Sequence, residues 1–442
     1  MTKGSIYKNV SVVDYSFQGL GVVKIDNFTI FVPFVKTGDE IDIEITDLKK
    51  NFGYGKALNY DLNKVECPYY YECGSCNMMH MPYGEQIGLK QKTLLNLMHK
   101  NLIYSKLEYF CSTDNREQYR NKISLPVHHV EGKLRLGYYR RSSHNLIPIT
   151  KCNLANDTLN SLITPIEDIL NQIGEHSYNY RNMRGNVRHV VLRGNSDNVM
   201  VTITTQTGKL KDEDYLVSEL NKYDFIKSII INTQKSKSRV ILGNKNRVIF
   251  GNQYIDLELA GKNFKVKPNA FFQVNQEMTN NIFDYINEQV DFTNKNVIDA
   301  FCGTGTIGLA LANDAKSIVG IEIDREAVES ANLNKELLEL DNVKYICDDI
   351  ENAIVKLDID GFDVAIVDPP RSGLAQNMKQ ALVAMQLNEI VYISCDPSTL
   401  MRDIGELMMH YEVETIKGFD MFPNTNHIET VAHLKLRKDK DE

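Results

Sequence analysis

The last third of the chain alternates short apolar runs with helical stretches, and few folds accommodate this alternation. The apolar runs NVIDAF, SIVGIEID, FDVAIVD and EIVYISC are separated by stretches such as AVESANLNKELLEL. Runs that are apolar at nearly every position are typical of strands buried on both faces, and helices between them make neighbouring strands parallel. The pattern therefore predicts an α/β domain with a Rossmann-like sheet over residues 264–442.

Two other patterns precede this domain and indicate two further domains. Within residues 1–59, the alternating runs GVVKI, FTIFVPFV and EIDIEI are broken by glycine and proline, which predicts a small antiparallel β-barrel. Within residues 60–263, apolar residues recur at helical intervals from Gly84 to Leu102, and strand-like runs such as VRHVVLRG follow. We expect a mixed α+β central domain there. A chain of 442 residues is long enough for three separate cores.

Positive charge is concentrated in one stretch of the chain. The formal net charge is −8, yet residues 90–152 contain twelve Lys and Arg against four Asp and Glu. Cations and aromatic rings are interleaved there, as in surfaces that contact phosphates and stack on bases. These residues are Arg116, Tyr119, Arg120, Lys122, Arg135, Tyr138, Tyr139, Arg140 and Arg141. The alternative is a solvated face with some buried tyrosines. We expect a nucleic-acid partner.

Other bulk features indicate a cytoplasmic protein. No apolar run approaches the roughly 20 residues of a membrane helix, and the first residues, MTKGSIYKNV, lack the apolar core of a secretion signal. We therefore expect no membrane partner. In a reducing cytosol the eight cysteines are thiols that are available for metal binding or catalysis.

A glycine-rich loop after the first strand of the α/β domain predicts a cofactor site. Gly303, Gly305 and Gly308 match G-x-G-x-x-G, a loop in which the backbone turns tightly beneath a dinucleotide or S-adenosylmethionine. Glu322, near the end of the next strand, is placed to accept hydrogen bonds from ribose hydroxyls.

Acidic residues also end the third and fourth strands. The third strand ends in Cys347-Asp348-Asp349, where the adenine edge is expected to bind. The fourth ends in Asp368-Pro369-Pro370-Arg371, a turn that the prolines stiffen. This turn resembles the loops of methyltransferases that act on nucleobases, which favours S-adenosylmethionine over a nicotinamide.

Cys395 is the candidate nucleophile, because it follows a strand at the sheet edge where α/β enzymes place their chemistry. An isolated cysteine is more often a small buried hydrophobe. Carbon 5 of uracil, however, attacks a methyl sulfonium only after a thiolate has added to carbon 6. A carboxylate must then remove the carbon-5 proton, and Glu429 suits that task. We expect His427 to be a positioning or packing residue. We expect Asp368 to hold the base or to polarise the uracil edge, besides contacting the cofactor.

Four further cysteines have the spacing of ligands. Cys67, Cys73 and Cys76 form C-x5-C-x2-C, and the distant Cys152 adds a fourth thiol. Four thiolates suit zinc or an iron-sulfur cluster, and the spacing by itself does not choose between them.

Taken together, these motifs resemble the RNA uracil-5-methyltransferase family over nearly the whole chain. The family has a Ser-Cys-(Asn/Asp)-Pro turn, here at Cys395, and a His-(Val/Ile)-Glu turn, here at Glu429, so the resemblance implies nucleophile and base at these positions. The residues implied for S-adenosyl-L-methionine binding, together with the glycine loop, are Gln273, Phe301, Gly303, Gly305, Thr306, Glu322, Asp349 and Asp368. The sequence departs from the family at Asn424, where many members have His or a bulkier residue.

The cysteine spacing resembles that of the family members that act on 23S ribosomal RNA, whereas the transfer-RNA members lack it. The resemblance implies a 4Fe-4S cluster on Cys67, Cys73, Cys76 and Cys152, with a structural or RNA-folding role because methyl transfer requires no redox step. It also implies a TRAM-like RNA-binding barrel over residues 1–59. A helix at 84–110 is expected to pack on the catalytic domain, which would make the central domain discontinuous. We expect a monomer that binds RNA and not DNA.

The sequence thus predicts methylation of carbon 5 of a uridine in 23S ribosomal RNA through a covalent bond to Cys395. One alternative is the same chemistry on transfer RNA, which the cysteine quartet disfavours. Another is a non-catalytic RNA-binding iron-sulfur protein, which Cys395, Glu429 and the glycine loop together disfavour. An amine methyltransferase, indicated by the Asp-Pro-Pro turn, leaves Cys395 without a task.

Overall fold

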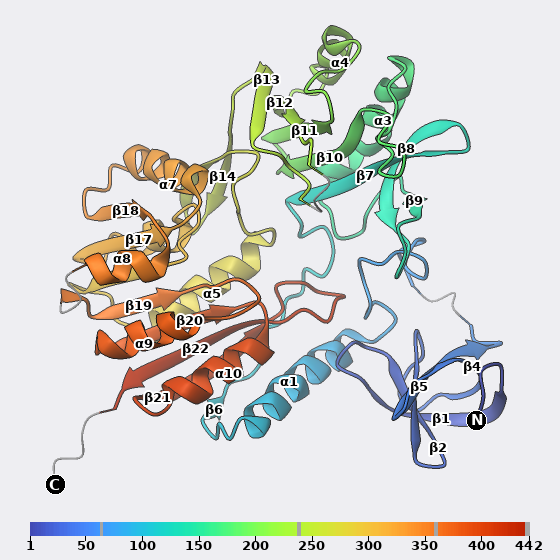
Figure 1. Cartoon of the computed structure of the whole chain (residues 1–442), viewed down its shortest axis with the longest axis horizontal. Helices are drawn as coiled ribbons and strands as arrows, with labels where there is room; N and C mark the ends of the chain where they lie inside the picture. The colour runs from blue at the N-terminus through green and yellow to red at the C-terminus, as the bar shows by residue number, and fades with distance from the viewer. Residues whose placement is uncertain (62–64, 237–239, 358–360, 438–442) are drawn as a thin grey trace.

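The computed structural model describes residues 1–61, 65–236, 240–357 and 361–437. These residues form a closed barrel, a seven-stranded sheet, an eight-stranded sheet and a two-stranded hairpin. In Figure 1 the barrel lies at the lower right, the seven-stranded sheet at the upper right and the eight-stranded sheet at the left. The arrangement confirms the predicted fold class, with a Rossmann-like α/β part at the C-terminal side, an N-terminal barrel and a mixed middle. Residues 438–442 of the predicted C-terminal domain lie outside the described residues.

The N-terminal barrel closes in the order β1-β2-β3-β5-β4. Its strands are β1 (Ile6–Tyr15), β2 (Gly21–Ile25), β3 (Phe28–Val32), β4 (Glu40–Leu48) and β5 (Phe52–Leu58). Alternate positions point inward, and Val23, Ile30, Val32, Ile43 and Ile45 have no exposed surface. The expectation of an all-antiparallel barrel fails at one pair, because β3 and β5 run parallel. Five strands in a ring cannot all alternate in direction, so one parallel pair is required for closure.

The central seven-stranded sheet has the order β13-β12-β11-β10-β7-β8-β9. Its strands are β7 (Lys122–Val130), β8 (Lys133–Tyr139), β9 (Leu146–Pro148), β10 (Val187–Gly194), β11 (Val199–Thr205), β12 (Ile226–Thr233) and β13 (Lys245–Gly251). Three helices pack against it: α2 (Asp157–Ser161), α3 (Ile163–Gln172) and α4 (Glu213–Leu220). The α4 crossover makes β11 and β12 parallel, while the other neighbours are antiparallel.

The eight-stranded sheet has the order β18-β17-β16-β19-β20-β22-β21-β6. Its strands are β16 (Asn296–Ala300), β17 (Ser317–Glu322), β18 (Val343–Cys347), β19 (Val364–Val367), β20 (Glu389–Ser394), β21 (Tyr411–Phe419), β22 (Glu429–Leu436) and β6 (Lys106–Leu107). Its helices are α6 (Thr306–Leu311), α7 (Arg325–Leu337), α8 (Ile350–Lys356), α9 (Gln376–Ala384) and α10 (Pro397–Leu407). The first five strands of the order are parallel, and β22 is antiparallel to β20.

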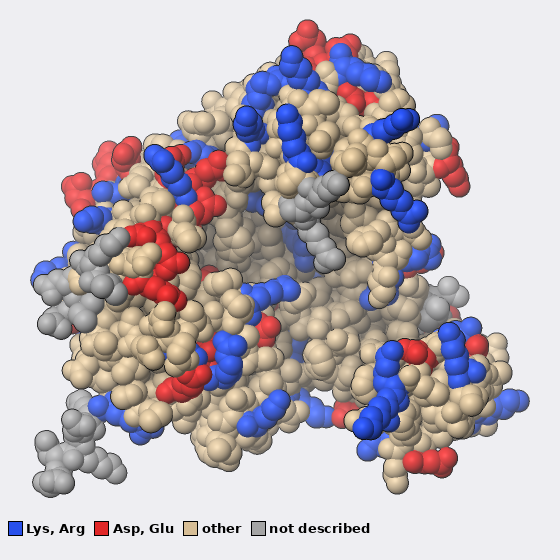
Figure 2. All heavy atoms as spheres, in the orientation of Figure 1, with Lys and Arg blue, Asp and Glu red and all other residues tan. Residues whose placement is uncertain are grey.

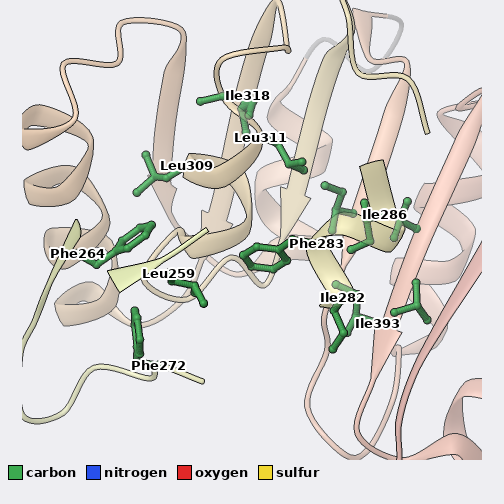
Figure 3. Packing of buried hydrophobic residues seen from close by; sticks show 14 of the residues in the cluster. Leu259, Phe264, Phe272, Ile282, Phe283, Ile286, Leu309, Leu311, Ile318 and Ile393 are labelled. Carbon is green, nitrogen blue, oxygen red and sulfur yellow. The ribbon is translucent and has the colours of Figure 1, made fainter. Parts of the chain in front are cut away.

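A hairpin and a helix outside the sheet complete its core. The hairpin β14 (Ile255–Leu259) and β15 (Lys262–Val266) and the helix α5 (Gln276–Gln289) share one hydrophobic cluster with the sheet. Figure 3 shows Leu259 and Phe264 of the hairpin near Leu309 of α6, and Phe283 of α5 facing the sheet. Both strands of the hairpin therefore pack with the C-terminal core. The domain boundary that we expected between residues 263 and 264 falls inside β15.

The helix expected at residues 84–110 is shorter in the structure. The helix α1 spans Tyr83–Lys100. The Asn101 amide donates back to the Leu97 and Met98 carbonyls, and Leu102 adopts a left-handed conformation with φ of 58°, so the helix cannot continue. The chain then enters β6, which pairs with β21, while α1 packs beside α10 (Figure 1).

The three parts surround a hollow. In Figure 2 the middle of the molecule is recessed between the barrel, the central sheet and the eight-stranded sheet, and Lys and Arg side chains lie at its margin. Among the described residues, no helix has both the length and the apolar composition that crossing a membrane demands.

Candidate functional site

The predicted site residues follow neighbouring strands of the eight-stranded sheet. The carboxyl ends of its five parallel strands meet at one edge, and the strand order reverses between β16 and β19. Open α/β sheets bind ligands at such a switch point. The glycine loop follows β16, and Glu322 is the last residue of β17. The loops after β18, β19 and β20 carry Asp349, Asp368 and Cys395.

The glycine loop has the conformation that its sequence predicts. Gly303 and Gly305 have φ of 55° and 76°, in the left-handed region that favours glycine. A Cβ atom at Gly305 would lie 2.2 Å from the Tyr345 hydroxyl, so no larger residue fits there. Glu322 accepts a hydrogen bond from the Gly303 amide at 3.1 Å. The predicted ribose-binding acid therefore lies directly against the loop.

Next to this loop lies a narrow cavity of about 40 Å³. The predicted cofactor residues that line it are Gln273, Phe301, Gly303, Thr306 and Asp368. The glycine loop and the Asp368 carboxyl in this lining are features of S-adenosylmethionine sites. Gly305, Glu322 and Asp349 lie outside the lining, and the Asp349 carboxylate caps α8 by accepting from the Glu351 amide at 3.0 Å.

Cys395 is accessible from this edge of the sheet. It lies half-buried between the last residue of β20 and the first turn of α10. That turn is well defined, because Asp396 caps α10 by accepting from the Ser398 amide at 2.9 Å and Pro397 occupies the first helical position. Burial raises the pKa of the Cys395 thiol, and the Glu429 carboxyl raises it further.

Two carboxyl groups lie close to this thiol. Burial raises the pKa of Asp368 to about 7. Burial, followed by the charge of Asp368, raises the pKa of Glu429 well above its ordinary value, and Glu429 is only 4% exposed. Like charges this close cannot all ionise together. Because its pKa is raised, a carboxylate formed at Glu429 is a stronger base than an ordinary carboxylate.

Arg371 is the cation of this group, and the sequence interpretation gave it no role. It hydrogen-bonds the Cys395 sulfur and lowers the pKa of that thiol, and its charge also lowers the pKa of Glu429. Its position directly after Asp-Pro-Pro was the available signal. A second residue missed from sequence is Asp299, whose buried carboxylate accepts from the Gly308 amide at 3.1 Å and whose pKa burial raises to about 7.

The loop that leads to Glu429, the first residue of β22, is held by α1. The buried Lys90 pairs with Asp420 at 2.5 Å, and Gln86 exchanges two hydrogen bonds with Asn424, one with its amide and one with its side chain. Asn424 has φ of 67°, which asparagine tolerates better than bulkier residues. Asn424, where the sequence departs from the family, is thus held in this conformation by Gln86. The exposed His427 meets Phe422 edge-on, with ring centroids 5.8 Å apart.

The four cysteines of the predicted cluster lie near one another as free thiols. Cys67, Cys76 and Cys152 belong to one small apolar group, and burial followed by the neighbouring Cys152 and Cys73 raises the pKa of Cys76 to about 12. Within the described ranges, no three His, Cys, Asp or Glu side chains converge on a single ion. The described residues therefore place the four thiols near one another without forming a metal-binding group.

Three consecutive residues connect the cysteines to the rest of the site. The Arg120 amide donates to the Leu154 carbonyl at 2.8 Å, two residues after Cys152. The Asn121 side chain donates to the Gln273 carbonyl at 3.0 Å, and the Tyr119 hydroxyl donates to the Pro423 carbonyl at 3.3 Å. Residues 119–121 therefore join the cysteine-rich segment, the cofactor cavity and the loop that leads to Glu429.

Comparisons with known proteins cover nearly the whole chain. Residues 82–437 match the tRNA (uracil-5-)-methyltransferase family, and residues 3–58 match the TRAM domain. Proteins described as uncharacterised RNA methyltransferases are similar throughout. One from Clostridium tetani is 35% identical over 99% of this chain and 98% of its own length. One from Staphylococcus aureus is 33% identical over 97% and 98%.

Among solved structures, the Pyrococcus abyssi tRNA (uracil-54, C5)-methyltransferase in complex with S-adenosyl-L-homocysteine has the same fold. It matches with a TM-score of 0.79 and 28% identity, over 97% of this chain and 100% of its own.

Proposed function

Since the chain belongs to the tRNA (uracil-5-)-methyltransferase family of S-adenosylmethionine-dependent RNA methyltransferases, we propose that it methylates carbon 5 of a uridine in 23S ribosomal RNA through a covalent bond to Cys395. The observation that carries the proposal is the electrostatic group at the edge of the cofactor cavity. There a half-buried thiol, two acids of raised pKa and one guanidinium act on one another.

In the proposed reaction the Cys395 thiolate adds to carbon 6 of the uracil. The electron pair of the C5–C6 double bond moves toward carbon 5 and the O4 carbonyl, which makes carbon 5 nucleophilic. Bound S-adenosylmethionine would supply an electrophilic methyl group to carbon 5, with the methyl–sulfur bond broken and S-adenosylhomocysteine as the leaving group. Phe301, Gly303 and Asp368 line the cavity that would hold the methyl donor. A base-modifying enzyme must also draw the uridine out of its stack.

Release of the product requires a base. After methyl transfer, carbon 5 carries both a hydrogen and a methyl group, and carbon 6 remains bound to sulfur. Glu429 takes the carbon-5 proton, the double bond forms again, and the thiolate leaves. Burial suits Glu429 to this step, because the carboxylate is strongly basic where its pKa is raised. The charge of Asp368 raises the pKa of Glu429 further, so Asp368 helps to set the proton affinity of the base.

Replacing Arg371 with Met should shift the pH dependence of methyl transfer. The guanidinium lowers the pKa of the Cys395 thiol, so its removal raises that pKa and leaves less thiolate at a given pH. At a pH below the thiol pKa, the thiolate fraction and the rate both fall about tenfold when that pKa rises by about one. The rising limb of the kcat/KM profile should therefore move to higher pH, and Arg371→Lys should recover part of the change.

The rate at which iodoacetamide alkylates Cys395, measured as a function of pH, reports the pKa of the thiol without RNA. Cys395→Ser supplies the background from the other cysteines. An unchanged alkylation profile in Arg371→Met would show that Arg371 does not act on the thiol.

The substrate proposal is supported by the thiol quartet, which resembles that of the ribosomal RNA members. The matched family and the Pyrococcus abyssi enzyme carry transfer RNA in their names, so transfer RNA is the second candidate. The test is incubation of the protein and labelled methyl donor with unmodified 23S ribosomal RNA and, separately, unmodified transfer RNA. We expect label as 5-methyluridine in the ribosomal RNA alone. Label in transfer RNA alone would favour the alternative, and no label in either would favour a non-catalytic RNA-binding protein.

We also propose that Cys67, Cys73, Cys76 and Cys152 hold a 4Fe-4S cluster with a structural role. Burial raises the pKa of the Cys76 thiol, and binding to iron would hold it as a thiolate near the half-buried Arg120. The Nε of Arg120 is buried and, in the part of the chain that the structure describes, has no hydrogen-bond partner, which fits an anionic neighbour.

Replacing Cys76 with Ser should therefore abolish iron binding. For protein purified without oxygen, we expect iron and sulfide to fall from about four atoms each to background, with loss of visible absorbance. The melting temperature should fall by several degrees, because cluster binding stabilises only the folded chain. The exposed Cys347 is the matched control, and Cys347→Ser should keep full iron content. Iron retained in Cys76→Ser, or absent from the wild type, would contradict the assignment.

A further inference from the structure

The segment that leads to the proposed base is held from outside its own sheet. Residues 422–427 lie between β21 and Glu429, the first residue of β22. We call residues 422–427 the base loop. Among the described residues, every hydrogen bond that leaves the base loop goes to a residue from Asn77 to Tyr119, and the others lie within the loop. The approach to Glu429 therefore depends on a part of the chain that is distant in sequence.

Asn77 contacts the base loop with both its side chain and its backbone. Its Nδ2 donates to the Asn426 Oδ1 at 2.8 Å, and the Asn426 amide donates back to the Asn77 Oδ1 at 2.9 Å. The Asn77 and Met78 amides both donate to the Asn424 carbonyl, at 3.3 and 3.1 Å. We call the reciprocal pair of Asn77 and Asn426 the asparagine clasp. A side-chain amide has one acceptor oxygen and two N–H donors, so Asn77 can form this pair and still donate once more.

The remaining bond of the Asn77 side chain reaches the barrel. Its Nδ2 also donates to the Gln18 carbonyl at 3.0 Å, in the turn between β1 and β2. That turn lies close against the cysteine-rich segment, because a Cβ atom at Gly19 would lie 3.1 Å from the Asn77 carbonyl oxygen and 3.0 Å from the Met78 side chain. Asn77 thus lies where the barrel, the cysteine-rich segment and the base loop meet.

The base loop is stiffened by bonds of its own, so a shift at Asn426 is passed on toward Glu429. The Thr425 hydroxyl donates to the Phe422 carbonyl at 2.8 Å and accepts from the His427 amide at 3.3 Å. Glu429 follows Asn426 closely in the sequence. A base must lie within hydrogen-bond reach of the proton that it removes, and a displacement of about 1 Å can slow such a step about 100-fold.

We propose that Asn77 is a positioning residue for the elimination step, which holds the base loop so that Glu429 faces the carbon-5 proton. The inference rests on the proposed covalent chemistry and adds a requirement to it. Asn77 does not line the cofactor cavity, and Cys395 is placed by β20 and α10. Sulfur addition and methyl transfer therefore do not depend on the asparagine clasp. Its loss should slow product release more than it slows methyl transfer.

The first measurement is hydrogen–deuterium exchange of the full-length protein without RNA, read by mass spectrometry. Asn77→Ala should exchange the amides of residues 422–428 about tenfold faster than wild type, as expected when about two hydrogen bonds are lost. Asn171→Ala is the matched control, because Asn171 is also half-buried and its side chain also makes three hydrogen bonds, all within the central domain. The control should leave exchange of residues 422–428 unchanged.

The second measurement separates the two halves of the reaction, with methyl donor and the RNA that accepts label. For Asn77→Ala, single-turnover methyl transfer should stay within about threefold of wild type. Multiple turnover should fall about tenfold or more, while a covalent protein–RNA complex accumulates. Asn426→Ala should behave alike, and the double variant should be no slower than either single variant, because all three lack the same pair. Asn171→Ala should keep the wild-type ratio of the two rates.

The proposal is overturned if exchange of residues 422–428 is unchanged in Asn77→Ala, if both rates fall equally, or if the effects of the two single variants add in the double variant. If Asn77→Ala exchanged faster throughout the chain, Asn426→Ala would decide, because it removes the same pair and leaves the bond from Asn77 to Gln18 intact. Absence of a covalent complex in Glu429→Gln as well would count against the proposed chemistry instead, and the exchange result would still decide whether Asn77 holds the base loop.

Discussion

Cys395→Ala should lose methyl transfer by at least about 10³-fold, because carbon 5 of the uracil remains electron-poor unless sulfur adds to carbon 6. The change removes one sulfur atom from a half-buried position between a strand and a helix that is capped by Asp396 and begins with Pro397, so the fold should persist. RNA binding should be retained, because basic side chains and not a thiol attract the phosphates of RNA. The loss should therefore appear in the single-turnover rate at saturating RNA and methyl donor.

Cys111→Ala provides the matched control for that loss. Cys111 is also a half-buried free thiol, but it packs against the core beside Asn281 and lies outside the cofactor cavity. We expect near wild-type rates for this variant. If Cys395→Ala kept more than a tenth of the wild-type rate, sulfur addition could not be part of the reaction.

Glu429→Gln should trap the enzyme on its RNA. The amide keeps the size of the side chain but cannot accept the carbon-5 proton, so addition and methyl transfer proceed and elimination stops. Multiple turnover should fall by about 10²-fold or more, while a covalent protein–RNA complex accumulates. Denaturing gel electrophoresis with labelled RNA measures the complex, which should depend on S-adenosylmethionine if methyl transfer precedes the blocked step.

Asp368→Asn tests whether the trapped complex is specific to the base. Asp368 lines the cofactor cavity, so its loss should weaken methyl transfer itself and give little methylated complex. A Glu429→Gln enzyme that turned over normally, or that formed no complex while still binding both substrates, would remove Glu429 from the role of base.

Local patterns were sufficient to predict much of this fold. The apolar runs after residue 290 became β16, β17, β19 and β20 of the parallel sheet. The glycine loop was also predictable, because left-handed backbone beneath a ligand requires glycine at Gly303 and Gly305. Placing Cys395 at the carboxyl edge of a strand followed from the run VYIS and the helix-starting Asp396-Pro397.

Long-range contacts were not predictable from local patterns. The pairing of Lys90 with Asp420 joins residues 330 positions apart, and neither residue lies in a motif that names the other. The same holds for β6, whose two residues join the edge of a sheet formed by the C-terminal third. The end of α1 was overestimated because the apolar residues after Leu97 resemble a continuing helix, whereas Leu102 has a left-handed conformation.

The role of Arg371 depended on side-chain geometry. In the sequence Arg371 is an arginine that follows two prolines. An arginine of a solvated turn would give the same pattern, so the sequence alone assigns it no role. The structure brings its guanidinium to the Cys395 sulfur and near the Glu429 carboxylate, and this proximity reveals its effect on both pKa values. Similarly, the sequence does not indicate that the Nε of Arg120 is buried and, among the described residues, lacks a hydrogen-bond partner, because this depends on how the chain packs around it.

The most direct test of covalent catalysis by Cys395 uses RNA in which the uridines are replaced by 5-fluorouridine. Fluorine takes the place of the carbon-5 proton, and a base cannot remove it. The wild-type enzyme should therefore stop after methyl transfer, with carbon 6 of the fluorouracil still bonded to sulfur. Mass spectrometry of the digested complex should find a methylated fluorouracil on the peptide that contains Cys395. A stable complex attached through a different cysteine, or turnover without any covalent complex, would contradict the mechanism.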